Sequence, residues 1–570
     1  MGLEKRWILN PVIDNPTDKE LDIYHPILRQ LLFNRGVYTR NEAAGYLNSA
    51  GSLYDPNELK SMDTAIARLR RAIKDGELIV IYGDYDVDGV TACTLLVEVL
   101  QKLDAQVERY VPNRFEEGYG LSIDGLDNLI ETYGKPDLII TVDCGIRSPK
   151  EVDEAKRRGI DIIVTDHHEP GEILPSAIAV ICPKQPGDDY PEKNLAGVGV
   201  AFKLCEAYLS RYADGTVDIT QWLDLVALGT VADIVPLTGE NRSMVKAGLR
   251  LMRYGQRPGL VSLANAAGID IRQIKTSEIS FGLAPRLNAA GRLETAMLAL
   301  DLLLSGKIED AAPNAQRLDD QNRQRQAITR SMLEEAAATI EPASNDFVLI
   351  ATNRTFNMGV VGLVASKLVD AYYRPAIVGA EADGYIRASC RSIPEFHITK
   401  ALDECSDLFE KHGGHAMAAG FTIKTEKLPI LKQRMNTIAQ TILEGRDLQP
   451  ELRVDMEINL STANPKDIFA SIDEIEPVGS ENPDVRFLTR KLQVVDKRQI
   501  SDGKHLKMRV KSGLHVFDAI AFGLGERYKH LPEHVDLVYN YELNSYRGQT
   551  NIQLNVRDIK ATEMDELILG

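Results

Sequence analysis

The hydrophobic positions change their spacing near residue 77. Before this point, residues 62–73 (MDTAIARLRRAI) carry apolar side chains at helical spacing, so residues 1–75 are predicted to be mostly helical. After it, short apolar runs alternate with helical stretches, and the predicted strands are ELIVIYGDYD, AQVERYVP, DLIITVDCG, IDIIVTDHHE and AIAVICP. This alternation is typical of a parallel sheet with helices on both of its faces.

The second half of the chain changes pattern twice more. Residues 314–340 are polar and free of glycine, and they predict one helix of about 40 Å that joins two domains. A second α/β unit begins near residue 346, and after residue 450 alternating strands with glycine-containing turns predict a small β-barrel. The predicted fold class is α/β with a C-terminal barrel. Its expected parts are residues 1–75, which pack on the next part, then 76–310, 311–342, 343–446 and 447–562.

Composition narrows the class of protein without fixing its function. The 570 residues are 44% hydrophobic and 26% charged, which suits about four ordinary globular domains. With a net charge of −17, the chain as a whole does not attract nucleic acid, so we expect any nucleic-acid binding to use a local basic channel. Six cysteines without a close pair indicate a reducing compartment, and no run approaches the about 20 apolar residues that cross a bilayer. We therefore expect a cytoplasmic protein with no membrane partner.

Three carboxylates, those of Asp84, Asp86 and Asp88, follow the first predicted strand within five residues. Repulsion between them calls for a cation or for protons. An EF-hand loop has the same opening pattern, but Leu95 stands where its bidentate glutamate belongs, and a strand precedes the loop in place of a helix. On this segment alone, a solvated acidic turn remains an alternative.

Later apolar segments also end in groups that can bind a metal, namely Asp143, Asp166, His167, His168 and Asp233. The carboxyl ends of parallel strands open on one crevice, so these groups are expected to meet the first three acids there. Carboxylates with one or two imidazoles and no thiolate are typical of Mn²⁺ or Mg²⁺ sites. Two such ions can clamp the oxygens of a phosphoryl displacement, which favours metal-assisted phosphoester hydrolysis. The chain has no GxxxxGK[ST] phosphate loop and no GxGxxG after a strand.

The runs GDYDVDG, VDCG and TDHHE resemble motifs of the DHH phosphoesterase family. Matching runs spread over roughly residues 55–560 and resemble the single-strand-specific 5′→3′ exonucleases of this family. The resemblance implies two Mn²⁺ or Mg²⁺ ions, held by Asp84, Asp86, Asp88, Asp143, His167 and Asp233. It implies catalytic roles for Asp143, His167 and His168. Asp84 could instead support the ligands without touching a metal itself. Asp166 is expected to orient its neighbours by hydrogen bonds.

Three further motifs carry groups that can contact phosphate or a base. Their residues are Arg114 and Tyr119 in VPNRFEEGYGLS, Arg286, Asn288 and Arg292 in APRLNAAGRL, and Ser389, Arg391 and His415 in the second α/β unit. The resemblance implies that Arg114, Ser389 and Arg391 hold the 5′-phosphate and that Arg286 or Arg292 lies near phosphate. The alternatives are a surface ion pair for Arg114, a helix end for the second motif and a structural role for His415.

Two places depart from the pattern of these exonucleases. Phe356-Asn357 stands where Trp-His is usual, and Ala388 and Cys390 stand where glycines usually flank the serine. The expected metal ligands are all present. The departures therefore put base stacking and the shape of the phosphate pocket in question, while the expected chemistry is unaffected.

The C-terminal strands resemble an oligonucleotide-binding (OB) fold. Candidate backbone contacts are Lys504, Lys507, Arg509, Lys511 and Arg547, with a solvated barrel face as the alternative. The function we expect is a single-stranded-DNA-specific 5′→3′ exonuclease that releases 5′-mononucleotides in recombination and repair. A single-stranded-DNA-binding protein and a helicase are candidate partners. The alternatives are a phosphodiesterase acting on short oligonucleotides or cyclic dinucleotides and a non-catalytic DNA-binding scaffold.

Overall fold

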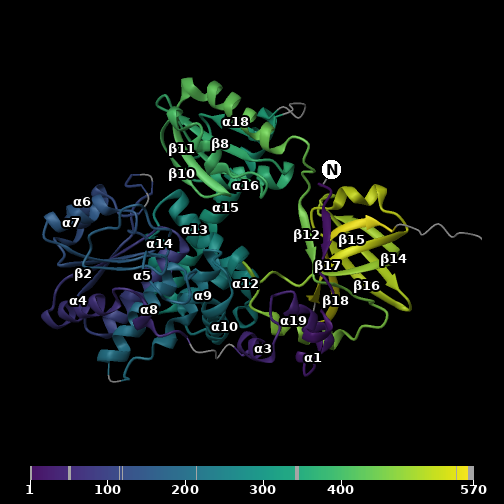
Figure 1. Cartoon of the computed structure of the whole chain (residues 1–570), viewed down its shortest axis with the longest axis horizontal. Helices are drawn as coiled ribbons and strands as arrows, with labels where there is room; N and C mark the ends of the chain where they lie inside the picture. Colours follow the sequence, from purple (N-terminus) through teal and green to yellow (C-terminus); the bar gives the residue numbers. More distant parts are fainter. Residues whose placement is uncertain are drawn as a thin grey trace, which may run out of the picture. The chain divides into compact units, whose positions relative to one another are not determined.

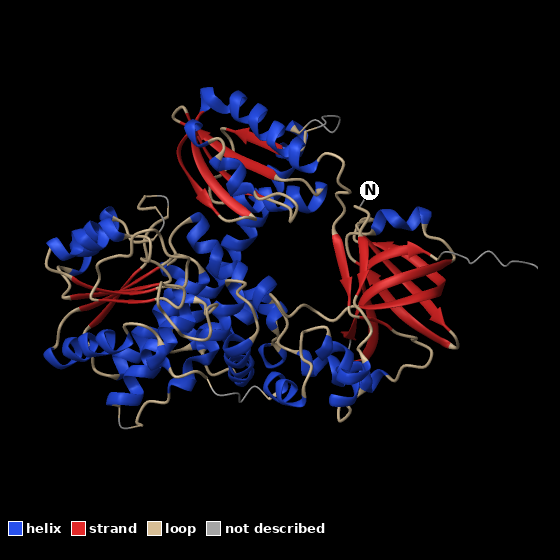
Figure 2. Ribbon diagram, viewed as in Figure 1, coloured by secondary structure: helices blue, strands red, loops and turns tan. Residues whose placement is uncertain are grey.

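The computed structural model describes residues 3–48, 53–114, 116–118, 120–213, 215–340, 346–546 and 549–562. Contacts divide the chain into two compact units, whose helices and strands are drawn in Figures 1 and 2. Unit 1 comprises Met1–Ala43, Gln326–Ile475 and Asp484–Gly570, and unit 2 comprises Ala44–Arg325 and Glu476–Pro483. The helices are not long and apolar enough, over the described residues, to cross a membrane.

Unit 2 is built around a five-stranded sheet of order β3-β2-β4-β5-β6. The strands are β2 (Ile79–Gly83), β3 (Val107–Tyr110), β4 (Leu138–Val142), β5 (Asp161–Thr165) and β6 (Ala179–Ile181). Every neighbouring pair is parallel. The carboxyl ends of the strands therefore share one edge of the sheet, as the sequence predicts.

Helices cover both faces of this sheet, which is why β2 and β4 are buried along their whole length. Ile79 and Ile81 belong to a core shared with α4 (Met62–Asp75), α5 (Val87–Lys102) and α8 (Gly197–Tyr212). Val80 and Tyr82 belong to the opposite core, with α6 (Ile123–Tyr133) and α7 (Pro149–Arg157). Alternate strand residues thus point to opposite faces and both sets are apolar.

The rest of unit 2 is mostly helical. Its remaining helices are α9 (Leu223–Ala232), α10 (Gly239–Tyr254), α11 (Pro258–Ala267), α12 (Thr276–Glu278), α13 (Ala284–Leu293) and α14 (Met297–Leu304). The helix α3 (Arg40–Leu47) begins in unit 1 and ends in unit 2. The long polar stretch forms a helix of 32 residues, α15 (Ile308–Thr339), which begins in unit 2 and continues into unit 1. The predicted long helix is confirmed, and it begins earlier than the polar pattern indicates.

Unit 1 contains a second five-stranded sheet, of order β10-β11-β9-β8-β7. Its strands are β7 (Leu349–Asn353), β8 (Ala376–Ala382), β9 (Tyr385–Arg391), β10 (Phe409–Gly414) and β11 (Ala418–Lys424). β7 and β8 are parallel and the other pairs are antiparallel. The helices of this part are α16 (Val361–Tyr372), α17 (Ile398–Asp403) and α18 (Leu428–Leu443).

The predicted barrel is present in unit 1. It contains β13 (Met456–Glu457), β14 (Phe487–Ile500), β15 (His505–Ser512), β16 (His515–Ala521), β17 (His534–Tyr546) and β18 (Gln549–Ala561). The order is β13-β14-β15-β16-β18-β17, and pairing of β14 with β17 closes the barrel. Alternate side chains of β15 fill its interior, and the positions between them, Lys507 and Arg509 among them, are more exposed.

The beginning of the chain differs from the prediction that residues 1–75 pack on the 76–310 domain. β1 (Arg6–Leu9) pairs in parallel with β12 (Glu451–Val454) of unit 1, and Trp7 Nε1 donates to Asp558 Oδ2 at 2.8 Å. Of the short helices that follow, α1 (Asn15–Glu20) and α2 (Pro26–Phe33), the second packs on α19 (Pro465–Ile475). The reason is the apolar face of the short strand, because Trp7 packs on the core around Leu452 and Val454.

A second difference lies inside the predicted 447–562 domain. Residues 476–483 belong to unit 2, where the Arg242 guanidinium donates to the carbonyl oxygens of Glu476 and Pro477 at 2.9 and 3.1 Å. The Leu237 amide also donates to the Ser480 carbonyl oxygen at 2.9 Å. One of these hydrogen bonds joins two backbone groups, and the others join backbone carbonyls to a single arginine side chain. A pattern of hydrophobic positions does not predict such bonds.

Candidate metal centre

The loop between β2 and α5 carries three of the predicted ligands. Asp86 is the N-cap of α5, and its Oδ1 accepts from the backbone N–H groups of Asp88 and Gly89 at 2.9 and 3.1 Å. Gly89 lies so close to Asp84 that an added Cβ would stand 2.5 Å from the Asp84 carbonyl oxygen. The D-x-D-x-D-G pattern therefore also has a structural basis, since it caps a helix and folds the loop back on itself.

The N-terminus of α8 holds the third of these carboxylates. Asp88 is fully buried, and its two oxygens accept from the backbone N–H groups of Gly197 and Val198 at 2.6 and 2.9 Å. An added Cβ on Gly197 would lie 2.7 Å from the Asp143 Cβ, so glycine is required there. Sequence reasoning missed this support. Its one sign is a glycine at the start of an apolar helix, and glycines are also common in the turns that precede helices.

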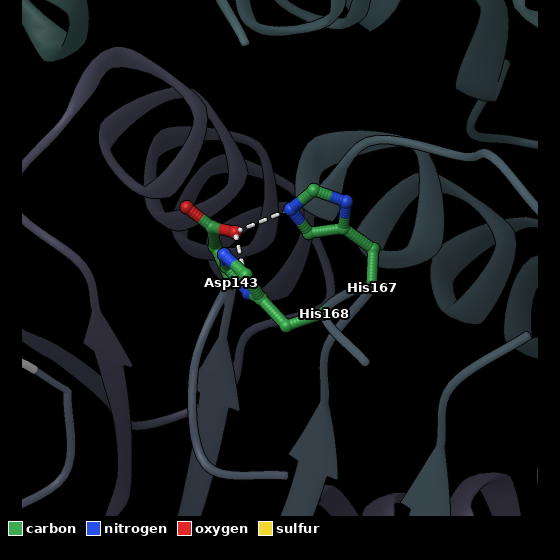
Figure 3. A group of neighbouring side chains, drawn as sticks. All are labelled: Asp143, His167 and His168. Atoms are coloured by element: carbon green, nitrogen blue, oxygen red, sulfur yellow. Dashed lines mark ion pairs between the residues drawn. The ribbon is translucent and has the colours of Figure 1, made fainter. Parts of the chain in front are cut away.

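The remaining ligands meet at the same edge of the sheet. Asp143 follows β4 with a φ of 59°, in the left-handed region, and is almost fully buried. His167, from the end of β5, places Nε2 at 3.0 Å from Asp143 Oδ1, 3.5 Å from Asp233 Oδ2 and 3.8 Å from Asp88 Oδ2. Figure 3 shows one carboxylate oxygen of Asp143 facing a ring nitrogen of His167 and a ring nitrogen of His168. The distance from His168 Nδ1 to Asp143 Oδ1 is 3.8 Å.

The structure brings all the predicted metal-binding side chains together. Three overlapping groups each have their ligand atoms within 4.8 Å of one another. They are Asp84, Asp86 and Asp143; Asp88, His167 and Asp233; and Asp143, His167 and His168.

The carboxylates of the cluster resist carrying charge on their own. Burial, with a contribution from nearby Asp86, raises the pKa of Asp88 to about 7. Burial and the carboxylates of Asp88 and Asp86 raise the pKa of Asp233 to about 8. The pKa values of Asp84 and Asp143 are raised for the same two reasons. The full negative charge of the cluster is therefore stable only together with cations.

The two histidines are tuned in opposite directions. Burial lowers the pKa of His167 to about 3, so its imidazole is neutral and can act as a ligand. Burial alone would lower the pKa of His168, but the hydrogen bond to Asp166 and the charges of Asp166, Asp233 and Asp84 together outweigh it and raise that pKa to about 9. Asp166 Oδ1 accepts from His168 Nδ1 at 2.8 Å and from the His167 N–H at 2.7 Å, and Oδ2 accepts from the Ile146 N–H at 2.9 Å. Asp166 thus orients its neighbours, as the sequence analysis anticipates.

Several atoms of the cluster fit a metal in their chemistry. Asp84 Oδ1, Asp143 Oδ1 and His167 Nε2 are buried, and none has a hydrogen-bond partner among the described residues. Although His167 Nε2 and Asp143 Oδ1 are 3.0 Å apart, their geometry is not that of a hydrogen bond. Buried polar atoms seldom lack partners, so this set of oxygen and imidazole donors suits a hard divalent cation.

Arginines gather next to the cluster. The Arg114 guanidinium lies 5.1 Å from the centre of the Tyr85 ring. Tyr85 is the residue between Asp84 and Asp86 in the acidic loop. Burial, followed by the charges of Arg114 and Arg325, lowers the pKa of Arg292 to about 10. Arg325 of α15 was not among the predicted residues, because nothing in a polar helix marks one arginine over the next. Tyr119 lies outside the described residues.

The other two residues of the APRLNAAGRL motif lie on α13. Arg286 Nη1 donates to the Gly282 carbonyl oxygen at 2.7 Å, and its Nε donates to Asp319 Oδ1 at 2.9 Å. Its guanidinium thus has protein partners on two sides. Asn288 is half-buried on the same helix.

In unit 1, the predicted phosphate residues of β9 lie at the start of α16. An added Cβ on Gly362, in the first turn of that helix, would stand 3.1 Å from Arg391 Nη2 and 3.5 Å from Ser389 Oγ. His415 is exposed between β10 and β11, and its N–H donates to the Ala418 carbonyl oxygen at 2.7 Å. A guanidinium, a hydroxyl and a helix N-terminus together are typical of an anion site.

The departures from the exonuclease pattern are accommodated by packing. Ala388, Cys390 and Phe356 are buried in the cores of unit 1. Asn357 Oδ1 accepts from the Gly359 N–H at 2.8 Å and so closes the turn before α16. These residues serve the fold of this part.

The cations of the barrel lie on its outer surface. Lys507 and Arg498 line a hollow together with Asp518, Asn544 and Asn551. Arg509 and Lys511 are also outside, on β15, and Lys504 precedes this strand. Arg547 lies outside the described residues. Both expectations for these residues, backbone contact and solvated face, are compatible with this placement.

Comparisons with known proteins identify three family domains. The chain matches the DHH family, N-terminal domain over residues 78–230, the DHHA1 domain over 345–441 and the RecJ OB domain over 454–558. It is 40% identical to the single-stranded-DNA-specific exonuclease RecJ of Bacillus subtilis over 94% of this chain and 68% of that protein. It is 34% identical to the RecJ of Escherichia coli over 94% of this chain and 96% of that protein.

A solved structure agrees. The crystal structure of RecJ in complex with Mn²⁺ from Thermus thermophilus has a TM-score of 0.83 at 29% identity, covering 98% of this chain and 80% of that one. The chain therefore belongs to the RecJ family of DHH phosphoesterases.

Proposed function

We propose that this protein is a single-stranded-DNA-specific exonuclease that degrades its substrate from the 5′ end and releases 5′-mononucleotides. The observation that carries the proposal is the meeting of acids and imidazoles from four separate segments at one edge of the sheet. The names of the RecJ relatives support the substrate. A role in DNA recombination and repair follows from this substrate, because single-stranded ends arise there.

Two Mn²⁺ or Mg²⁺ ions are the cofactors in this proposal. Solved relatives from Thermus thermophilus are described in complex with Mn²⁺ and with Mg²⁺. The ligands we assign are Asp84, Asp86, Asp88, Asp143, His167 and Asp233. When bound, such ions activate water and neutralise the charge that develops on the phosphate.

The chain's own residues have defined tasks around these ions. The α8 amides fix Asp88, and Asp166 fixes the backbone N–H of His167 and the ring Nδ1 of His168. Because His168 Nδ1 is engaged by Asp166, its Nε2 is the nitrogen we assign to the substrate. There it would donate to the departing 3′-oxygen or to a phosphate oxygen.

Recognition of phosphate is assigned to residues in both units. In unit 1, Ser389, Arg391 and the α16 N-terminus bind the terminal 5′-phosphate, which sets the polarity. In unit 2, Arg114 and Arg292 bind phosphate oxygens beside the metal centre. Three predicted contacts stay predictions, those of Tyr119, Asn288 and His415. Arg286 acts indirectly in our proposal, because its guanidinium braces α13.

The cellular setting is proposed on chemical grounds. A helicase would supply the single strand and a single-stranded-DNA-binding protein would cover it, so both are expected partners. We place the protein in the cytoplasm, since its six cysteines are all buried free thiols, as a reducing compartment keeps them.

Degradation of end-labelled oligonucleotides tests the proposal. With Mn²⁺, a 5′ label on a long single strand should appear at once as a mononucleotide, while a 3′ label should stay on shortening intermediates. The matching duplex and samples with excess chelator should remain intact. The matched inactive protein is Asp143→Ala.

Each rival function predicts another result. A short-oligonucleotide phosphodiesterase would cleave dinucleotides and leave long strands intact. A scaffold would give equal residual digestion for the unaltered protein and for Asp143→Ala. Either result would remove the exonuclease assignment.

A further inference from the structure

One aromatic ring of unit 2 is displayed to solvent. Phe281 is 85% exposed, and no other described aromatic side chain is as exposed. It lies in η4 (Ile279–Leu283), a π-helical turn between α12 and α13. An isolated phenylalanine on the surface gains nothing from burial, and π-helical turns recur at functional sites.

The π-helical turn has a definite cause. In an α-helix, the Pro285 ring would collide with the carbonyl group of the residue four before it, which is Phe281. The turn avoids the collision, since the Ala284 N–H donates to the Ile279 carbonyl oxygen five residues back. Proline at 285 thus fixes an irregular turn at the position of the exposed ring.

Two further contacts lock this turn. Arg286 connects the Gly282 carbonyl oxygen to Asp319, a buried carboxylate of α15. An added Cβ on Gly282 would lie 2.4 Å from Ile269 Cδ1, so the backbone packs closely at this point. The ring of Phe281 is therefore presented from a rigid backbone, as a binding surface requires.

The same helix connects this ring with the metal centre. Pro285, Asn288 and Arg292 are half-buried and lie at helical spacing along one side of α13, which directly follows the turn of Phe281. At the far end, an added Cβ on Gly291 would lie 2.7 Å from the Tyr85 carbonyl oxygen, inside the acidic loop. α13 rises about 12 Å over the eight residues from Ala284 to Arg292, and Phe281 lies in the turn before Ala284.

We propose that Phe281 stacks on a nucleobase of the bound single strand, a few nucleotides away from the bond that is cut. The inference rests on the proposed function, which supplies the strand. The ring offers a flat apolar face that any base can cover, so it adds affinity without sequence preference. The turn of Phe281 and the helix α13 after it then carry an aromatic ring, an amide and a guanidinium in succession, in the direction of the metals.

Substitution at this position separates stacking from catalysis. Phe281→Ala should raise KM for a 5′-phosphorylated oligo-dT of 20 nucleotides about tenfold, and Phe281→Tyr should stay close to the unaltered protein. Cleavage of a 5′-phosphorylated dinucleotide, which is too short to reach the ring, should be the same in all three. The control is Tyr254→Ala, which removes another solvent-exposed ring, at 76%, from α10 of the same unit.

Fluorescence gives a second readout that does not need turnover. The chain has two tryptophans, of which Trp222 is buried, so Phe281→Trp would add a strongly exposed reporter. Oligo-dT added to metal-depleted protein should quench this new emission. Emission from the unaltered protein should change little.

The outcomes are distinct. An unchanged KM for Phe281→Ala, or no added quenching in Phe281→Trp, would overturn the stacking role while leaving the exonuclease function intact. A changed sedimentation coefficient with unchanged DNA binding would assign the ring to a protein contact instead. If the unaltered protein degrades no strand, the proposed function itself fails, and binding of oligo-dT still decides the role of Phe281.

Discussion

A single methyl group at the start of α8 should damage the metal centre and spare the fold. In Gly197→Ala, the new Cβ would lie 2.7 Å from the Asp143 Cβ and 2.9 Å from its Oδ1, where ordinary contact begins at 3.4 Å. Asp143 must then shift by several tenths of an ångström from its position beside His167. Displacements of about 1 Å cost about 10²-fold in rate, so we expect a loss of between 10- and 100-fold.

The cost to the fold should be small. Gly197 has no left-handed φ, so alanine adds no backbone strain there. Overpacking costs about 1–3 kcal/mol, and the smaller entropy loss of alanine on folding offsets about 0.4–1 kcal/mol of it. The melting temperature should change by only a few degrees, while the affinity for Mn²⁺ falls with the activity.

Three measurements on one pair of variants check this reasoning. They are the melting temperature in chelator, Mn²⁺ affinity by calorimetry and the rate on a single-stranded oligonucleotide. The matched control is Gly45→Ala, a helical glycine of α3 whose added Cβ meets nothing within 4 Å. A folded Gly197→Ala with normal Mn²⁺ affinity and normal rate would refute the tight placement of Asp143.

Three more predictions concern charge. Because the pKa values of Asp88 and Asp233 are raised to about 7 and 8, the folded protein without metal holds more protons than the unfolded chain. The free energy of unfolding in urea should therefore fall as pH rises from about 4 to about 8. Saturating Mn²⁺ should remove this pH dependence. A flat profile in chelator would contradict the prediction. Asp166→Asn should lower the pKa of the neighbouring His168 from about 9 and reduce activity about 10- to 100-fold, so an unchanged pH–rate profile would count against its positioning role. Arg391→Ala should erase most of the preference for 5′-phosphorylated over 5′-hydroxyl ends in competition assays, whereas the exposed Arg434→Ala should not; equal behaviour of the two would remove the phosphate assignment.

The metal centre was predictable because strand periodicity and parallel topology place strand ends together. Asp143 and His167 follow apolar runs, so a sheet with parallel neighbours brings them to one edge wherever its helices pack. The acidic loop adds three more ligands next door. For these residues, the position at the end of a strand in the sequence is enough to predict that they lie at the same edge of the sheet.

The supporting contacts could not be predicted in the same way. The bonds from Gly197 and Val198 to Asp88 use backbone N–H groups, which every residue except proline has. The guanidinium of Arg286 binds the Gly282 carbonyl oxygen and the carboxylate of Asp319, which is distant in sequence. The sequence alone does not distinguish these partners from a bound phosphate. These details depend on packing between helices, which a hydrophobic pattern does not specify.

The pairing of β1 with β12 has a consequence for how the chain is made. The stretch from α4 to α14 supplies the whole parallel sheet of unit 2 and can assemble while the ribosome is still translating. The strand Arg6–Leu9 leaves the ribosome early but has to wait until Glu451–Val454 emerges. Until then its apolar side chains are unprotected, so the nascent polypeptide carries an open edge while the residues between the two strands are made, and chaperones would be expected to act at this edge.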